Sequence, residues 1–297
     1  MRVLTSLSTC FIFSIFPMQT DRRPDRLSAD LALLPDFVDT RTADALLDAV
    51  LGENHRRPTT AAAGGGGDLP PPPPSLGPGW KAAAGRAVKS AGGAVLGSTL
   101  IPAPLPAWAI ALFTRLAAAG VGFGGCGGGD GEGGEHDEAA RAAPNHVLIN
   151  AYPAGAGILA HTDGPAYAPV AAILSLGDDS PAVIRFYPAA AAGGGGEPAP
   201  PSFSVFLPPR SLLVFKGAAY SDHRHGIEAV DEDGIDDGVL NAGGAAEWLL
   251  DQRGGGGGGT GGAPGGPPSP LTIRRGPLRV SLTVRRVKRV RAGVLRL

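Results

Sequence analysis

Runs of glycine and proline constrain this chain more than any other feature of its sequence. The 297 residues include 47 Gly and 29 Pro, about a quarter of the chain, whereas roughly 12% is usual in globular proteins. Many stand in low-complexity runs: Gly64–Gly67, Pro70–Pro74, Gly193–Gly196 and Gly254–Gly259. Such runs contribute little to a packed hydrophobic core. They leave roughly 190–210 residues for a hydrophobic core, the size of one domain rather than two.

The same runs mark the expected domain boundaries. We expect a leader at residues 1–30, a single folded domain at residues 31–293 and a short tail at residues 294–297. Within the domain, low-complexity insertions are expected at about 59–78, 120–140, 189–202 and 234–270.

Cysteine content and hydropathy exclude several classes of protein. Cys10 and Cys126 are too few for a disulfide framework, which favours a reducing compartment. No run of 18 apolar residues exists, so we expect no membrane span. Val3–Met18 has the apolar character of a signal peptide, although five Ser or Thr interrupt it and no cleavage site is clear. Targeting to an organelle or secretion through residues 1–20 therefore stays open as an alternative.

Charge is unevenly distributed along the chain. The net charge is −1, yet residues 271–297 contain nine Arg or Lys and no Asp or Glu. A basic C-terminal stripe can attract the phosphates of a nucleic acid. It can equally keep a last strand soluble, and the sequence alone leaves both interpretations open.

Hydrophobic spacing predicts a mainly β protein with flanking helices. One helix is expected after a capping Thr40 or Thr42, and a second from about Pro106 through Leu116. From Asn145 onward, short apolar runs between turns are typical of an antiparallel sandwich or barrel. The expected strands are His146–Tyr152, Val170–Leu176, Val183–Tyr187, Phe203–Leu207, Leu212–Phe215, Gly226–Val230 and Leu278–Val290.

The segment His161-Thr162-Asp163 can supply two metal ligands. Residues i and i+2 of an extended segment point to the same face, so the imidazole and the carboxylate can bind one ion. With His225 they would form a two-histidine, one-carboxylate set, which suits Fe(II) in oxygenases. His-x-Asp alone is a weak signal, because Asp163 can also cap a turn. His223 competes with His225 for the third position.

The segment Arg279–Arg285 alternates strictly between polar and apolar residues. Val280, Leu282 and Val284 share one face, and the polar face is formed by Arg279, Ser281, Thr283 and Arg285. In a half-buried strand the polar face would meet solvent. In a barrel around an anionic ligand it would line the cavity, because an arginine fork binds a carboxylate through two hydrogen bonds.

Taken together, these motifs resemble the AlkB-type iron(II)/2-oxoglutarate dioxygenases, and within that family the eukaryotic group of the sixth AlkB homologue. The resemblance spans about residues 31–293, apart from the insertions. It is carried by the following phrases: Asn145–Tyr152, His161–Pro165, Pro209–Val214, His225–Ile227 and Arg279–Arg291.

The resemblance implies a double-stranded β-helix, or jelly roll, with iron held by His161, Asp163 and His225. It also implies 2-oxoglutarate contacts from Asn150, Tyr152, Arg279, Ser281 and Arg285. Arg279 would pair with the distal carboxylate, and Arg285 would serve either the metal-side carboxylate or Asp163.

The implied reaction consumes O₂ and 2-oxoglutarate, releases succinate and CO₂, and hydroxylates a C–H bond. If that bond belongs to an N-methyl group of RNA or DNA, the product loses formaldehyde. The resemblance further implies a monomer in the nucleus and cytoplasm.

One departure and two alternatives remain. Only small residues surround Ala91, where relatives have an aromatic side chain that could stack on a flipped-out base. The alternatives are a dioxygenase that acts on a protein side chain and a non-catalytic β-barrel module that binds nucleic acid or protein through its basic C-terminus. Retention of all three metal ligands and Arg279 favours the enzyme.

Overall fold

The computed structural model describes residues 25–52, 78–124, 143–177, 180–189, 199–254 and 271–291. Residues 1–24 of the expected leader, most of the expected insertions and the tail lie outside these ranges. Among the described helices, none is long and apolar enough to cross a membrane.

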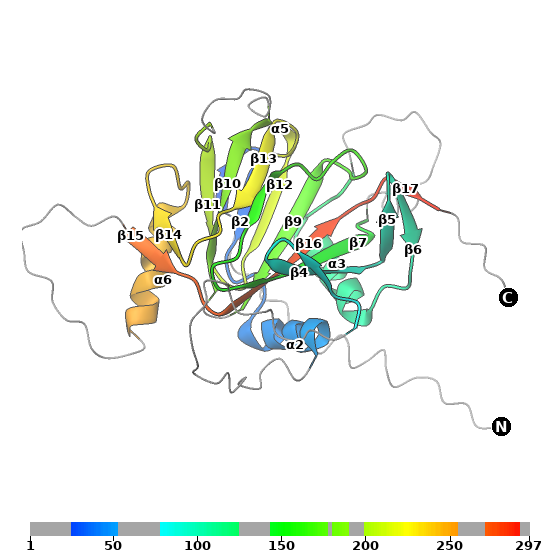
Figure 1. The fold of residues 1–297 in the computed structure, drawn as a ribbon, viewed down its shortest axis with the longest axis horizontal. Helices are drawn as coiled ribbons and strands as arrows, with labels where there is room; N and C mark the ends of the chain where they lie inside the picture. The colour runs from blue at the N-terminus through cyan, green and yellow to red at the C-terminus, as the bar shows by residue number, and fades with distance from the viewer. Residues whose placement is uncertain are drawn as a thin grey trace, which may run out of the picture.

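Two antiparallel sheets form the body of the molecule (Figure 1). The eight-stranded major sheet has the order β1-β2-β12-β9-β16-β7-β4-β3. Its strands are β1 Asp25–Ser28, β2 Leu31–Leu34, β3 Lys81–Ala83, β4 Arg86–Ala91, β7 His146–Pro153, β9 Val170–Leu176, β12 Leu212–Lys216 and β16 Leu278–Arg285.

The four-stranded minor sheet has the order β11-β10-β13-β8 and consists of β8 Ile158–His161, β10 Ala182–Pro188, β11 Phe203–Leu207 and β13 His223–Ile227. The two sheets enclose one apolar cluster contributed by both, including Ile173 and Phe215 from the major sheet and Ile184 and Phe186 from the minor. This is the expected jelly roll.

Helices α2 (Thr40–Leu51) and α3 (Ala107–Ala118) pack on the outer face of the major sheet. Their buried residues share a second apolar cluster with alternate residues of β4, β7, β9 and β16. On β16, Val280, Leu282 and Val284 belong to this cluster. The polar face of β16 must therefore point inward, between the sheets, and the barrel-lining interpretation of the alternating pattern is confirmed.

The helix α2 begins one residue earlier than a threonine cap would place it. Asp39 is the N-cap, and its carboxylate accepts a hydrogen bond from the Thr42 backbone N–H at 2.7 Å. Thr40 and Thr42 are already helical, so the prediction of a threonine cap was wrong. The second helix begins after Pro106, as expected.

Part of the stretch expected to be an insertion at 234–270 is ordered. The strand β14 (Glu232–Ile235) pairs with β15 (Leu271–Arg274), and α6 (Ala242–Gly254) lies beside them. Together they cover Val183 and Phe206 on the outer face of the minor sheet, with Trp248 and Leu249 packing from α6. Glycine content concealed a helix that tertiary packing stabilises. Residues 255–270 lie outside the described part of the chain.

Three further boundaries differ from expectation. Ordered structure includes β1, which pairs with β2 and begins at Asp25 rather than after residue 30. β13 covers His223–Ile227 instead of Gly226–Val230, because its partner β10 pairs with residues 223–226. The last expected strand is divided, since β16 ends at Arg285 and β17 (Arg289–Val290) changes partner to β6 (Thr99–Pro102). β6 also pairs with β5 (Gly93–Leu96).

Candidate metal centre

Two neighbouring strands of the minor sheet bring three of the predicted residues together. His161 ends β8, and its Cα pairs directly with that of His225 on β13. Asp163 follows two residues after His161. One ligand atom from each of the three side chains lies within 4.8 Å of the others, and the two imidazole centroids are 4.5 Å apart. Among the described residues this is the single group of three or more His, Cys, Asp or Glu side chains close enough to hold one metal ion.

Glycines allow β8 and β13 to approach closely enough for this arrangement. A Cβ on Gly226, directly after His225, would lie 2.8 Å from the Ala160 backbone nitrogen. A Cβ on Gly157 would lie 2.3 Å from the Ile227 carbonyl oxygen. Real side chains do not fit at such distances, so the closeness of the two histidines depends on glycine at both positions.

Both imidazoles are prepared to offer a lone pair. Nδ1 of His161 lies 2.8 Å from the Leu159 carbonyl oxygen, which can only accept, so Nδ1 carries the proton and Nε2 is free to bind. Burial lowers the pKa of His225 to about 4, partly offset by the Asp163 carboxylate and reinforced by His161 and Arg285. At neutral pH the His225 ring is therefore uncharged, as a metal ligand must be.

Asp163 is held by Arg285 on one oxygen only. Arg285 Nη1 donates to Asp163 Oδ1, and both side chains are almost completely buried. The second carboxylate oxygen, Oδ2, is buried and has no hydrogen-bond partner among the described residues. Of the two roles considered for Arg285, the structure supports the orientation of Asp163. An unpartnered carboxylate oxygen beside two imidazoles fits a divalent cation.

A second polar group lies deeper between the sheets, on β16 and β7. Arg279 is 4% exposed and donates from Nη2 to the Ser175 hydroxyl at 2.9 Å. Its Nε and Nη1 are buried with no partner among the described residues. Burial lowers the pKa of Arg279, yet a guanidinium stays charged at any ordinary pH. A buried cation with two free donors fits the carboxylate of a ligand.

The register between β16 and β7 brings the other residues predicted to contact 2-oxoglutarate to the same side of the inner cavity. Tyr152 is paired across the strands with Arg279, and Asn150 with Ser281. The Asn150 amide donates to the Ser281 hydroxyl at 3.4 Å, and its oxygen accepts from Arg86 Nε at 3.2 Å. Burial raises the pKa of Tyr152, which keeps its hydroxyl protonated. All eight predicted site residues line one narrow inner cavity.

The inner cavity meets a large outer groove of about 1580 Å³ at the metal centre, since His161, Asp163 and Arg285 line both. Arg86 and Tyr167 also line the groove. The Arg285 guanidinium carbon lies 4.0 Å from the centre of the Tyr167 ring, so Tyr167 covers the Asp163–Arg285 pair.

Sequence reasoning missed Ser175 and Arg86. Ser175 lies within an otherwise apolar strand, where a buried hydroxyl was the available signal. Arg86 lies on a strand that the sequence did not predict.

Two positions raised by the sequence lie outside the site. His223 turns away from the metal group: its Nδ1 lies 3.0 Å from the Ala218 carbonyl oxygen, and its ring packs near Phe203. Ala91 is buried in the cluster beneath α2 and α3, on the far face of the major sheet. A larger side chain there would meet the helices rather than the groove. The small residue at this position therefore gives no argument against nucleobase binding.

A jelly roll that presents two imidazoles, one carboxylate and a deeper buried arginine in one cavity defines a class of metal-dependent oxygenases. Comparison with protein families agrees with this definition. Residues 30–285 match the model of the 2OG-Fe(II) oxygenase superfamily, and the chain belongs to that family.

Individual proteins that resemble this chain share less than a third of its residues in the aligned regions. A Danio rerio protein named "Probable RNA/DNA demethylase ALKBH6" is 28% identical over 168 residues, covering 55% of this chain and 64% of that protein. This match supports the AlkB-like resemblance. The chain spans somewhat less than two thirds of the length of this relative.

Among solved structures, "The structure of OsALKBH1" has a TM-score of 0.45 and 16% identity, covering 89% of this chain and all of that one. An oxidoreductase of the 2OG-Fe(II) oxygenase family from Burkholderia pseudomallei has a TM-score of 0.38 and 15% identity, covering 89% of each chain.

Proposed function

We propose that this protein is an iron(II)- and 2-oxoglutarate-dependent dioxygenase that removes N-linked methyl groups from RNA or single-stranded DNA. The observation that carries the proposal is the metal group itself, with His161, Asp163 and His225 within 4.8 Å at the junction of an inner cavity and an open groove. A bound Fe(II) would supply the activation of O₂ that couples decarboxylation of 2-oxoglutarate to oxidation of a C–H bond.

In this proposal each protein side chain has a defined role. His161 and His225 offer imidazole nitrogens, and Arg285 holds Oδ1 of Asp163 so that Oδ2 stays available to the metal. Arg279, whose Nε and Nη1 have no hydrogen-bond partner among the described residues, pairs with the distal carboxylate of 2-oxoglutarate. Asn150, Tyr152 and Ser281 provide further polar contacts along the same wall.

The outer groove would hold the methylated substrate. It has room for a nucleobase displaced from its strand, and its lining includes Tyr167 and Tyr187, which offer aromatic faces for stacking. The name of the Danio rerio relative refers to RNA and DNA demethylation, which favours nucleic acid over a protein side chain as the substrate of this chain.

The decisive experiment measures succinate formed from 2-oxoglutarate by the purified protein with Fe(II), ascorbate and O₂. Addition of an N-methylated oligonucleotide should increase succinate and release formaldehyde in equal amounts. His225→Ala should abolish both products. His223→Ala is the matched control, because it removes a histidine two residues away that does not face the metal group, and it should retain turnover.

The remaining alternatives predict different results. Formaldehyde released from a methylated peptide but not from an oligonucleotide would indicate a protein-directed dioxygenase. Tight binding of an oligonucleotide without binding of metal or 2-oxoglutarate would indicate a non-catalytic interaction module.

Localisation in the nucleus and cytoplasm and a monomeric state remain predictions from the family resemblance. Fluorescent fusions with and without residues 1–20 test the localisation, and light scattering tests the monomeric state.

A further inference from the structure

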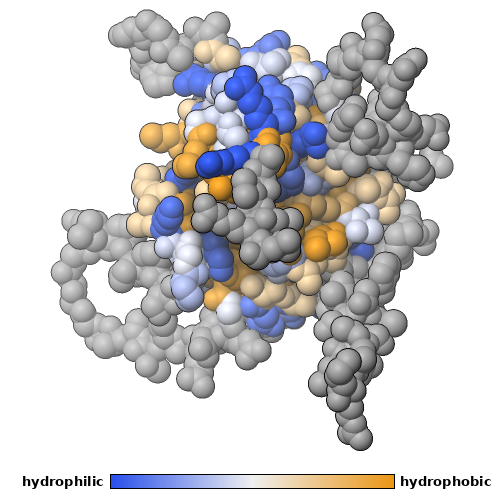
Figure 2. All heavy atoms as spheres, turned by 90° about the vertical axis from the view of Figure 1, so that its right-hand side faces the viewer, coloured by the Kyte–Doolittle hydropathy of each residue, from blue (hydrophilic) through white to orange (hydrophobic). Residues whose placement is uncertain are grey.

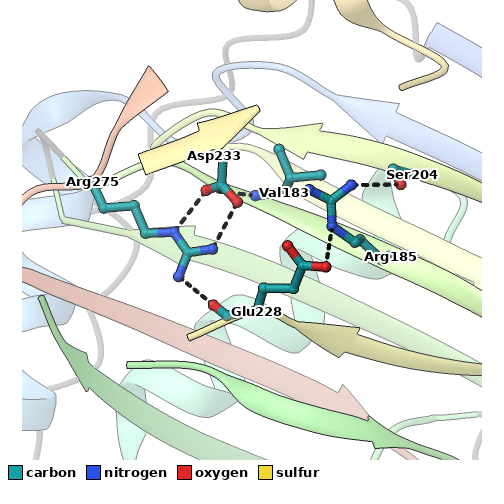
Figure 3. Close-up of polar contacts among 6 residues, drawn as sticks. All are labelled: Val183, Arg185, Ser204, Glu228, Asp233 and Arg275. Atoms are coloured by element: carbon teal, nitrogen blue, oxygen red, sulfur yellow. Dashed lines mark hydrogen bonds and ion pairs between the residues drawn. The ribbon is translucent and has the colours of Figure 1, made fainter. Parts of the chain in front are cut away.

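Two buried arginines lie beside the minor sheet, outside the metal centre (Figure 3). Arg275 forms a two-bond pair with Asp233, with Nε and Nη2 each 2.7 Å from a carboxylate oxygen. The Arg275 side chain is 6% exposed and that of Asp233 is 1% exposed. Arg185 instead pairs with the Glu228 carboxylate at 3.1 Å and donates to the Ser204 hydroxyl.

Of these two arginines, Arg275 also binds backbone. Its Nη1 donates to the Ala156 carbonyl oxygen at 3.1 Å and to the Glu228 carbonyl oxygen at 2.7 Å. Ala156 lies in the turn before β8, five residues ahead of His161. Glu228 follows β13 directly, three residues after His225. One guanidinium therefore joins the chain segments that lead to the two histidines.

The two histidine strands need such a tie, because their own pairing is sparse. β8 and β13 share only the pairs His225–His161 and Ile227–Ile158, with an irregularity between them. β8 is also the edge strand of the minor sheet, so no strand of the described residues pairs with it on the other side. A shift of one residue would turn His161 to the opposite face of the sheet and separate the two imidazoles.

We infer that Arg275 is a positioning residue for the metal centre, which sets the spacing of His161 and His225 by joining the carbonyl oxygens of Ala156 and Glu228. The inference rests on the proposed function, since it presupposes that the two histidines bind one metal ion. Asp233 orients the guanidinium. Because its carboxylate accepts hydrogen bonds from Nε and Nη2, Nη1 is left to donate to the two carbonyl oxygens. Asp233 is itself anchored to the minor sheet through the Val183 N–H at 3.2 Å.

Cobalt(II) binding to the full chain tests this role without reference to turnover. Arg275→Met alone would leave Asp233 buried without its partner, so the main variant is Arg275→Met with Asp233→Asn, which removes both charges and keeps an acceptor for Val183. We expect the Kd for Co(II) to rise about tenfold or more, as is typical when groups that orient metal ligands are lost. The visible absorption spectrum of the bound Co(II) should change as well.

Arg185→Met is the matched control. It removes a buried guanidinium from the same neighbourhood, but one whose ion pair and hydrogen bond in the described part of the chain both go to side chains, and the Kd for Co(II) should stay within about twofold of the wild-type value. Arg275→Lys should partly restore binding, because an ammonium group can donate to the carbonyls but cannot grip Asp233 through two parallel bonds.

Thermal unfolding separates positioning from general stability. A double variant that binds Co(II) with wild-type affinity and spectrum would overturn the inference, even if its Tm were lower. An equal loss of affinity in Arg185→Met would overturn it too. If the double variant fails to fold, Arg275→Lys is the deciding variant. Wild-type affinity of Arg275→Lys for Co(II), together with a lowered Tm, would show that Arg275 stabilises the fold without positioning the metal centre. Absence of Co(II) binding by the wild-type protein would refute the proposed metal centre itself.

Discussion

Two side chains of the inner cavity differ from ordinary core residues because they have buried polar atoms without a hydrogen-bond partner among the described residues. Arg279 and Asp163 are buried and charged, and each retains polar atoms without a partner in the described part of the chain. Burying a charge is costly unless it is paired, so these atoms imply ligands of opposite charge. A cation beside Asp163 and a carboxylate beside Arg279 satisfy both requirements.

Replacement of Arg279 should selectively weaken binding of 2-oxoglutarate. Arg279→Met removes a buried, charge-assisted pair worth about 2–4 kcal/mol, so the Kd for 2-oxoglutarate should rise by roughly 30- to 1000-fold. Calorimetric titration of the Co(II)-loaded protein measures the change. Arg274→Met, an exposed arginine five residues earlier, should bind as wild type. Equal affinity in Arg279→Met and wild type would contradict the assignment.

His146 should make the stability of the metal-free protein depend on pH. Burial, aided by Arg285, lowers the pKa of His146 to about 4, whereas the unfolded chain has the ordinary value near 6.5. The unfolded state then binds more protons between these values. His146 therefore contributes up to about 3 kcal/mol to the free energy of unfolding. This contribution is fully present above pH 6.5 and is lost as the pH falls toward 4.

Urea unfolding at several pH values tests this dependence. His146→Leu should lose less stability on acidification than the wild type. Part of the slope should remain, because the pKa of His225 is lowered in the same direction. Identical slopes in the two proteins would show that His146 does not contribute.

At the scale of elements, pairs of strands rather than single strands make the site. β8 is only four residues long and was not predicted from the sequence, and in the minor sheet it pairs with β13. The strand β16 is the opposite case. Its alternation predicted which residues share each face, and the structure shows that the apolar face packs under the helices in the centre of the major sheet, between β7 and β9.

Gly226→Ala should disturb the contact between β8 and β13. The added Cβ would approach the Ala160 nitrogen at 2.8 Å and the Ile158 carbonyl oxygen at 2.9 Å, so the strands must separate. We expect a loss of about 1–3 kcal/mol in the free energy of unfolding, together with weaker Co(II) binding. Gly243→Ala in α6 is the control: its Cβ would meet nothing within 4 Å, and stability should be kept or raised. Wild-type Co(II) affinity in Gly226→Ala would argue against close strand contact as a requirement.

Over the described part of the molecule, charge is uneven along the long axis. Residues 286–291, which lead into β17, contain four Arg or Lys and no Asp or Glu, whereas residues 228–252 contain carboxylates and no Lys or Arg. In Figure 1, β5, β6 and β17 lie at one end and β14 and α6 at the other. Figure 2 views the first of these ends, where strongly hydrophilic residues gather next to a more apolar area.

A basic strip extends from the groove toward this end. It consists of Lys288, Arg289 and Arg291, all exposed. The backbone N–H of Lys288 donates to the Ala166 carbonyl oxygen, beside the groove residue Tyr167. A strand whose base enters the groove could therefore lay its phosphates along the strip.

Neutralising the strip should weaken nucleic-acid binding in a salt-dependent way. Changing all three residues to Ala should lower affinity for a single-stranded oligonucleotide by roughly 10- to 100-fold at low salt. The slope of log K against log salt should become shallower by about 2. Fluorescence anisotropy over a salt series measures both quantities.

The control for the strip changes the same number of exposed basic residues elsewhere. Arg26, Arg41 and Lys216 lie on β1, α2 and β12. Replacing these three by Ala removes equal charge and should leave the affinity and its salt slope nearly unchanged. Equal effects of the two triple variants would indicate attraction by overall charge and would refute a defined path.

The sequence by itself predicted which side chains gather at the site and most of the core. His161 and Asp163 were identifiable because two ligands of one metal must share a face, and the resemblance to AlkB-type dioxygenases added His225 and Arg279. The helices α2 and α3 and the strand β16 followed from hydrophobic period, which depends on local geometry alone.

Only the tertiary structure decided which partners those residues meet. It showed that Arg285 binds Asp163, which is 122 residues away along the chain. It also decided that His225 rather than His223 faces the metal group, that α6 forms within a glycine-rich stretch, and that Arg275 reaches the backbone beside both histidine strands. Each depends on strand pairing and packing between distant segments, and no local pattern in the chain encodes such contacts.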